Sequence, residues 1–196
     1  MTPINPETTL EALAAIVSQA LEAAGIQATL SGGSAVSVYA MNEYESDDLD
    51  FVTSGSQAAL ETALGPLGLV RSVNRRQFEH PEIGWLVEFP PGPLAFGDTL
   101  VLHENVPVLG TPFGPLRIIT PTQSVLDRLA AYYDYSDNQC WDQAALVARH
   151  QEIDWVAVSR WIAEEGQPDR DVDRLRDRAK LAASRIGGIR VRQTRD

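Results

Sequence analysis

The stretch that decides the fold runs from Leu30 to Val52 and reads LSGGSAVSVYAMNEYESDDLDFV. An apolar segment at 26–30 has the character of a short strand, and a glycine turn follows it at once. A helical pattern resumes over 35–41, and a polar loop leads to a second strand-like segment at 48–53. This order predicts a strand, a tight turn, a helix and a second strand within one compact unit.

Asp48 and Asp50 lie two residues apart in the second of these strands. Because alternate residues of a strand point to the same face, both carboxylates are expected on one face, while Leu49 and Phe51 enter the core. Two carboxylates this close repel each other unless a cation lies between them. Their oxygen atoms suit Mg²⁺ or Mn²⁺, which also bind substrate phosphates. The pair predicts a metal site, although an isolated Asp-x-Asp is also common as surface charge.

Gly32, Gly33 and Ser34 form the turn between the first strand and the helix. Glycines allow a phosphate to approach the backbone, and the start of a helix offers free N–H groups and a favourable dipole. Ser34 adds a hydroxyl donor. A Gly-Gly pair alone can be only a turn, but this turn and the acidic pair occur together in one strand–turn–helix–strand unit. Their joint presence favours a phosphate cradle beside a metal site.

The segment resembles the signature of the nucleotidyltransferase superfamily that includes DNA polymerase beta. That signature is an apolar residue, Gly-Gly or Gly-Ser, a helix, and Asp-x-Asp flanked by apolar residues; the sequence SDDLDF over 46–51 matches its second half. The match is specific over residues 30–52. It most resembles the compact bacterial branch linked to toxin–antitoxin and phage-defence systems, including abortive-infection toxins.

The resemblance implies that Asp48 and Asp50 bind two divalent ions and that Gly33 and Ser34 hold the β and γ phosphates of a nucleoside triphosphate. It also implies a third carboxylate on a later strand, and Glu88 in the apolar run LVEF is the best candidate. Glu88 would complete the metal site and help to remove a proton from the acceptor. A carboxylate on an edge strand is the alternative interpretation of Glu88.

Three arginines are candidates for phosphate binding. Arg75 and Arg76 precede a predicted strand and could reach the triphosphate, or they could be plain solvated charge. The related toxins carry a Lys on a helix after the sheet, where this chain has Asp127 and Arg128. This departure puts toxin activity in question. Arg128 could still contact a phosphate, and an Asp–Arg pair that braces two helices is the alternative.

The rest of the chain predicts an α+β protein: an N-terminal nucleotidyltransferase-type mixed sheet flanked by helices, followed by a C-terminal helical bundle. Thr8 and Glu11 fit a capping box for a first helix that ends near Gly25. The predicted domains are 1–119, α/β, and 120–196, helical with a frayed tail. Further helices are expected at 57–64, 121–133, 138–149, 154–165 and up to about 185, and further strands at 77–80, 85–89, 99–102, 106–109 and 116–119.

The composition of the chain limits the classes of function that are possible. A formal net charge of −11 argues against broad, nonspecific nucleic-acid binding, which needs clustered Lys and Arg. Cys140 is the single cysteine, so an internal disulfide is excluded and a packing role is expected. No apolar run approaches the roughly 20 residues of a membrane span, and residues 1–11 lack a signal-peptide pattern. A cytoplasmic location without membrane contact is therefore expected.

The leading hypothesis is a metal-dependent nucleotidyltransferase that moves a nucleoside monophosphate from a triphosphate to a hydroxyl of RNA, protein or a small molecule. The alternative is a non-catalytic antitoxin or regulatory protein that keeps the fold and acts by binding a cognate partner. A glycosyltransferase that holds a sugar nucleotide through Asp-x-Asp is a third hypothesis, but it leaves the Gly-Gly-Ser turn unexplained.

Overall fold

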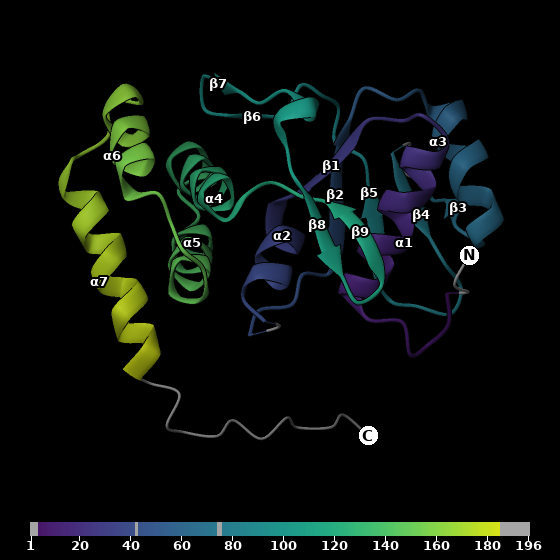
Figure 1. Ribbon diagram of the computed structural model, residues 1–196, viewed down its shortest axis with the longest axis horizontal. Coiled ribbons are helices and arrows are strands. Elements are labelled where there is room, and N and C mark those ends of the chain that lie inside the picture. The colour runs from purple at the N-terminus through teal and green to yellow at the C-terminus, as the bar shows by residue number, and fades with distance from the viewer. Residues whose placement is uncertain (1–3, 42, 74–75, 185–196) are drawn as a thin grey trace.

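The computed structural model describes residues 4–41, 43–73 and 76–184 (Figure 1). The predicted phosphate contact of Arg75 and the predicted frayed tail lie outside these residues. The centre is a five-stranded sheet with the order β1-β2-β5-β4-β3. Its strands are β1 (Ala28–Ser31), β2 (Asp48–Thr53), β5 (Leu86–Glu88), β4 (Gln77–Glu79) and β3 (Val70–Arg71). The sheet is mixed because β2 and β5 are parallel, whereas the other neighbours are antiparallel.

Three helices and two small hairpins surround the sheet. The helices are α1 (Leu10–Ala23), α2 (Gly32–Tyr39) and α3 (Gln57–Leu64), with a short 3-10 turn η1 (Gly65–Leu67). The hairpins are β6 (Ala95–Phe96) with β7 (Thr99–Leu100), and β8 (Val108–Thr111) with β9 (Gly114–Arg117); the 3-10 turn η2 (His103–Asn105) lies between them. A parallel bridge from Leu30 to Ile118 joins the chain after β9 to the edge of β1.

The side chains of β2 alternate between the core and the opposite face of the sheet. Leu49 and Phe51 are fully buried, and Phe51 stacks near Phe89 beside β5. α1 packs on β1, β9 and α3, which closes this core. The alternation leaves Asp48 and Asp50 together on the other face, as the sequence predicts.

Four helices follow the sheet: α4 (Pro121–Tyr135), α5 (Asn138–His150), α6 (Trp155–Glu164) and α7 (Arg170–Ser184). Thr120 and Gln123 form a reciprocal capping box at the start of α4, with Pro121 in the first turn. The indole of Trp161 donates to the carbonyl of Phe96 at 3.0 Å, so the helical part contacts the β6–β7 hairpin. The α+β prediction of a mixed sheet followed by a helical bundle is confirmed. None of the described helices is long and apolar enough to cross a bilayer.

Several predicted boundaries are wrong by one to three residues. Thr9, not Thr8, caps α1, because the side chain of Thr9 accepts from the backbone of Ala12, whereas the hydroxyl of Thr8 accepts from Asn5 in the preceding turn. α2 begins at Gly32 instead of residue 35, so the glycines belong to the helix. The short strands β3 and β6 have two residues each and were not predicted, and β8 and β9 are displaced from the predicted ranges.

Candidate metal and nucleotide site

Three carboxylates from neighbouring parallel strands converge on one face of the sheet. The register pairs Asp48 with Leu86 and Asp50 with Glu88, so Glu88 lies beside Asp50 on the same face. Ligand oxygens of Asp48, Asp50 and Glu88 all lie within 4.8 Å of one another. The strand pairing therefore brings together the three acids that the sequence analysis singled out. β5 is central in the sheet, between β2 and β4, so Glu88 is not an edge-strand carboxylate.

The surroundings of Asp50 disfavour a charged carboxylate. Burial, followed by repulsion from Asp48 and Glu88, raises the pKa of Asp50 to about 7, although the nearby Arg128 opposes this shift. A divalent cation among the three acids would remove the repulsion and favour the ionised form. The all-oxygen donor set also matches Mg²⁺ and Mn²⁺. The residues thus fit the metal ions that the sequence predicts.

Two neutral side chains hold the outer acids in place. The hydroxyl of Ser46 donates to Oδ1 of Asp48 at 3.0 Å. The amide of Gln77 in β4 donates to Oε1 of Glu88, and Gln77 faces Glu88 directly in the antiparallel register. Ser46 is the first residue of the segment 46–51 that matches the signature, but nothing in the local pattern marks Gln77. Its role depends on the pairing of β4 with β5, which a single sequence does not reveal.

The glycines of the turn admit the protein's own side chains. Gly32 has φ 66°, and a Cβ there would lie 2.2 Å from Oδ2 of Asp50. A Cβ on Gly33 would lie 2.9 Å from the hydroxyl of Ser46 and 3.1 Å from that of Tyr44. From the sequence, both glycines are predicted to allow a phosphate to come close to the backbone. The structure adds that they allow the acidic strand to lie directly against the start of α2.

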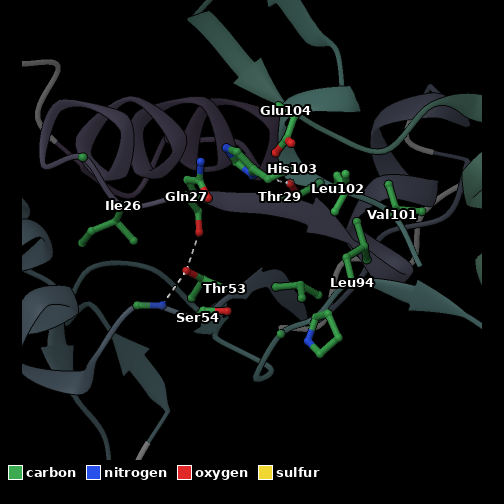
Figure 2. Close-up of a pocket in the computed structure, with 15 residues that line it drawn as sticks. Ile26, Gln27, Thr29, Thr53, Ser54, Leu94, Val101, Leu102, His103 and Glu104 are labelled. Atoms are coloured by element: carbon green, nitrogen blue, oxygen red, sulfur yellow. Dashed lines mark hydrogen bonds between the residues drawn. The ribbon is translucent and has the colours of Figure 1, made fainter.

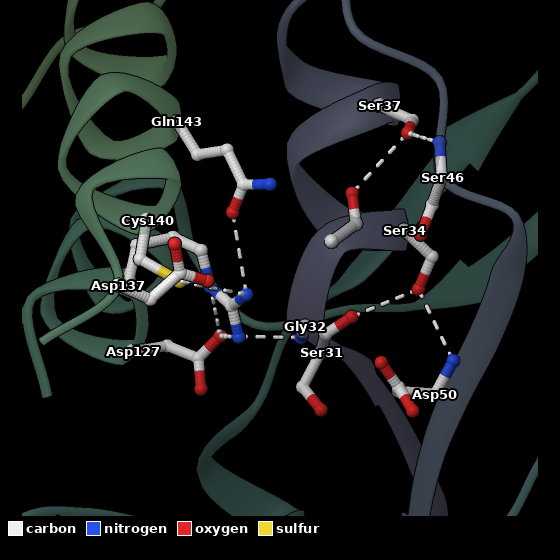
Figure 3. Close-up of polar contacts among 12 residues, drawn as sticks. Ser31, Gly32, Ser34, Ser37, Ser46, Asp50, Asp127, Asp137, Cys140 and Gln143 are labelled. Carbon is white, nitrogen blue, oxygen red and sulfur yellow. Dashed lines mark hydrogen bonds and ion pairs between the residues drawn. The ribbon is translucent and has the colours of Figure 1, made fainter. Parts of the chain in front are cut away.

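Ser34 joins α2 to both strands. Its hydroxyl donates to the carbonyl of Ser31 at 2.8 Å and accepts from the backbone N–H of Asp50 at 3.2 Å (Figure 3). The side chain is fully buried. Its single hydroxyl hydrogen is donated to Ser31, and its oxygen accepts from Asp50. Ser34 therefore fixes the position of the Asp50 backbone relative to α2. The predicted contact of Ser34 with a phosphate stays a prediction.

The start of α2 already interacts with an anionic group. The backbone N–H of Gly32 donates to Oδ2 of Asp127 in α4 at 3.2 Å (Figure 3). The same oxygen accepts from Nε and Nη2 of Arg128 at 3.0 and 2.7 Å. Nη1 of Arg128 donates to Gln143 in α5 at 3.3 Å. A carboxylate paired with an arginine thus lies where a helix N-terminus favours negative charge.

Other candidate residues have contacts elsewhere in the protein. Arg76 donates to the carbonyls of Phe89 and Thr53, which ties β5 to the end of β2. Asp142, the acidic residue on the second helix after the sheet, pairs with Arg178 of α7 at 2.8 Å. Tyr132 packs against Trp141, and Tyr133 packs against Trp161. Cys140 is buried beside Asp137 and Arg128, in agreement with a packing role.

No model of a known protein family matches the chain, and no curated protein matches it. Among solved structures, it is similar to the solution structure of the antibiotic-resistance factor ANT(2'')-Ia, with 14% identity and a TM-score of 0.45 over 91% of this chain and 95% of that chain. It is also similar to the crystal structure of ANT(2'')-Ia in complex with adenylyl-2''-tobramycin, with 14% identity and a TM-score of 0.45 over 89% and 97% of the two chains.

Proposed function

We propose that this protein is a metal-dependent nucleotidyltransferase that moves a nucleoside monophosphate from a nucleoside triphosphate to a hydroxyl acceptor. The observation that carries the proposal is the convergence of Asp48, Asp50 and Glu88 beside the N-terminus of α2. Asp48, Asp50 and Glu88 would hold two Mg²⁺ or Mn²⁺ ions. Bound ions would activate the acceptor hydroxyl and neutralise charge on the phosphates.

The triphosphate tail would bind at the start of α2, over Gly32, Gly33 and Ser34. The carboxylate of Asp127 supports this placement, because it shows that an anion can accept from the N–H of Gly32 while it pairs with Arg128. A phosphate oxygen would take the place of Asp127 and gain the same two partners. Arg128 would then stabilise charge on the departing pyrophosphate.

In the reaction, the acceptor oxygen attacks the α-phosphorus and a new P–O bond forms. The bond between the α-phosphorus and its bridging oxygen breaks, and pyrophosphate leaves with the electron pair. Glu88 receives the proton of the acceptor hydroxyl, because its carboxylate lies beside Asp50 and is oriented by Gln77.

The test is label transfer from each α-labelled triphosphate, with Mg²⁺ or Mn²⁺ and a cell extract. Asp48→Asn and Asp50→Asn should reduce the transfer to background, because each removes one charged ligand. Asp47→Asn is the matched control, since Asp47 is exposed directly before β2 and the substitution should leave transfer unchanged. Equal transfer by the wild type and by the Asp48/Asp50 variants would refute catalysis at this site.

A second candidate is a binding protein without catalysis, such as an antitoxin or a regulatory partner in a toxin–antitoxin or phage-defence system. One observation favours it: the N–H of Gly32, the hydroxyl of Ser34 and the guanidinium of Arg128 all have partners within the protein. In that case Asp48→Ala would leave partner binding intact, and no triphosphate would raise the melting temperature. Stabilisation by a triphosphate with Mg²⁺, lost in Asp48→Ala, would exclude this candidate.

A further inference from the structure

Residues at the start of β1 and at the end of β2 line a cavity of about 460 Å³ (Figure 2). In the antiparallel register of β1 and β2, Ser31 faces Asp50 and Thr29 faces Val52. Alternate residues share a face, so Thr29 and Val52 form the next pair along the face that holds Asp50. Both line the cavity. Its near wall is therefore only about 6.6 Å along the strand from the acidic pair.

Two loop segments form the other walls of this cavity. The chain after β5 contributes Gly92, Pro93 and Leu94, and it is fixed by a hydrogen bond from the N–H of Gly92 to the carbonyl of Thr53 at 3.1 Å. The chain from Val101 to Glu104 continues this wall, because the N–H of Val101 donates to the carbonyl of Leu94 at 2.9 Å. The ring of His103 contacts the hydroxyl of Thr29 at 3.0 Å, so this segment is tied to β1.

The cavity lies beyond Asp50, toward the end of β2 that is farther from Gly33. Gly33, where the triphosphate tail is proposed to bind, is close to Ser46 and Tyr44, which precede Asp48 in the chain. Val52 follows Asp50 at the opposite end of the strand. In phosphoryl transfer the attacking and leaving oxygens lie roughly in line across the phosphorus. If pyrophosphate leaves toward α2, the attacking hydroxyl must arrive from the side where the cavity opens.

The side chains that line the cavity indicate which kind of acceptor could bind there. Of the described residues that line the cavity, none is Lys, Arg, Phe, Tyr or Trp, and Glu104 is the carboxylate among them. Burial and the nearby Arg117 lower the pKa of His103, which keeps its ring uncharged at neutral pH. RNA is held by cationic side chains on phosphates and by aromatic stacking on bases, and the described lining has neither. The rest of the lining combines the apolar side chains of Ile26, Val52, Leu94, Val101 and Leu102 with the uncharged polar side chains of Gln27, Thr29, Thr53 and Ser54.

We propose that this cavity binds the acceptor, and that the acceptor is a small alcohol that is uncharged or positively charged and has an apolar surface. The proposal rests on the proposed function and names the substrate class for it. The cavity volume of about 460 Å³ falls within the roughly 300–1,000 Å³ of small-molecule sites. An anionic acceptor would meet Glu104 in the cavity and the three carboxylates at its near end. A nucleobase of the donor is disfavoured there for the same lack of aromatic side chains.

Two substitutions in the cavity have matched controls in α6. Val101→Trp places a large ring in the cavity, and Val156→Trp makes the same change at an exposed position far from it in sequence. Glu104→Lys reverses the charge in the cavity, and Glu164→Lys is its exposed control. Melting temperatures of all four variants establish that they fold. If Val101→Trp lowers stability, Glu104→Lys provides the independent test.

The experiment uses an α-labelled triphosphate, Mg²⁺ and a cell extract separated into small molecules, RNA and protein. We expect label in the small-molecule pool, on a product whose parent alcohol is not retained by an anion exchanger. Val101→Trp should lower kcat/KM for the acceptor in that pool by on the order of tenfold or more and leave the KM for the triphosphate unchanged. Glu104→Lys should lower kcat/KM for a cationic acceptor by a similar factor. Tobramycin, a polycationic alcohol, serves as a defined probe.

The outcomes separate this proposal from the proposed function. Label in the RNA or protein pool, or full transfer by Val101→Trp and Glu104→Lys, would overturn the acceptor site while nucleotidyl transfer stands. A rise in the KM for the triphosphate in Val101→Trp would assign the cavity to the donor nucleoside and also overturn it. Absence of label in every pool, with no pyrophosphate released, would reject nucleotidyl transfer itself and the acceptor site with it.

Discussion

Gly32 joins β1 to α2 with φ at 66°, and its Cα lies against the carboxylate of Asp50. Two separate requirements meet at this residue. The left-handed backbone is one, and the lack of space for a Cβ is the other. The chain also contains one glycine that has only the first requirement and one that has neither. Gly25 has φ 69° with nothing within 4 Å of a Cβ, and Gly65 has φ −53° with equally open space.

Alanine at these three glycines should therefore give a graded series. Gly65→Ala is expected to change the free energy of unfolding little, and Gly25→Ala to cost about 1–2 kcal/mol for the left-handed backbone. Gly32→Ala should cost more than Gly25→Ala, because Asp50 must also move. Urea unfolding measures the series. Equal losses for Gly32→Ala and Gly25→Ala would show that the contact with Asp50 contributes nothing.

The raised pKa of Asp50 predicts how stability depends on pH without metal. The folded-state pKa of about 7 lies above the unfolded value of roughly 3.9, so the folded state binds more protons between these values. Stability from this group is present below about pH 4 and is lost as the pH rises through about 7, a change of the order of a few kcal/mol. Urea unfolding in EDTA at several pH values measures it.

Asp50→Asn is the control for this dependence, since it cannot ionise. The wild type should lose stability relative to Asp50→Asn as the pH rises from 5 to 8, and Mg²⁺ should restore stability mainly at the higher pH. Parallel pH profiles for the two proteins would contradict the assignment of the raised pKa to Asp50.

At the scale of secondary structure, α2 is held in place by a serine inside its first turn. Ser34→Ala removes the acceptor of the N–H of Asp50 and the donor to Ser31. An unpaired buried polar group costs about 1–3 kcal/mol, so the melting temperature should fall. Ser72→Ala, in the loop between β3 and β4, is the control and should have little effect. If Ser34→Ala kept full stability and raised only the KM for triphosphate, Ser34 would bind phosphate instead.

The elements of the site could be predicted from the sequence because their signals are local. One short segment contains both the period-two alternation at Asp48 and Asp50 and the glycine pair at the start of the helix. The outward direction of Glu88 follows from the same alternation. Its distance to Asp50 does not, because it depends on β2 and β5 being parallel neighbours although the chain between them passes through α3, β3 and β4.

The contacts at the start of α2 could be predicted less completely for a related reason. Gly32 and Ser34 can be recognised from the sequence, but Asp127 reaches Gly32 from a helix 95 residues later. The tie of Gln77 to Glu88 across two strands and the wall that Val101 to Glu104 builds beside β1 are equally nonlocal. Residue spacing reveals which side chains share an element, and it carries no information on which elements become neighbours.

At the scale of the whole molecule, Asp127 connects the sheet part to the helical part. Its side chain and that of Arg128 are 17% and 15% exposed, so the pair is largely removed from water. Asp127→Asn leaves a buried guanidinium without its charged partner and should cost about 3 kcal/mol of stability. Asp134→Asn, exposed on the same helix α4, is the control.

The same variant also tests whether phosphate and Asp127 share one position. In Asp127→Asn the N-terminus of α2 and Arg128 no longer bind a competing negative charge, so a triphosphate should bind with a lower Kd although the protein is less stable. Calorimetric titration with Mg²⁺ and a triphosphate measures this affinity. A Kd that increased in parallel with the loss of stability would instead assign Asp127 a direct part in binding.

Three of the four tryptophans, Trp141, Trp155 and Trp161, belong to α5 and α6, and the indole of Trp161 ends on a carbonyl of the β6–β7 hairpin. The intrinsic fluorescence of this protein is therefore dominated by tryptophans of the helical bundle, and one of them, Trp161, contacts the β6–β7 hairpin. A red shift of that emission would record separation of the helical bundle from the hairpin, even while circular dichroism still reported intact helices.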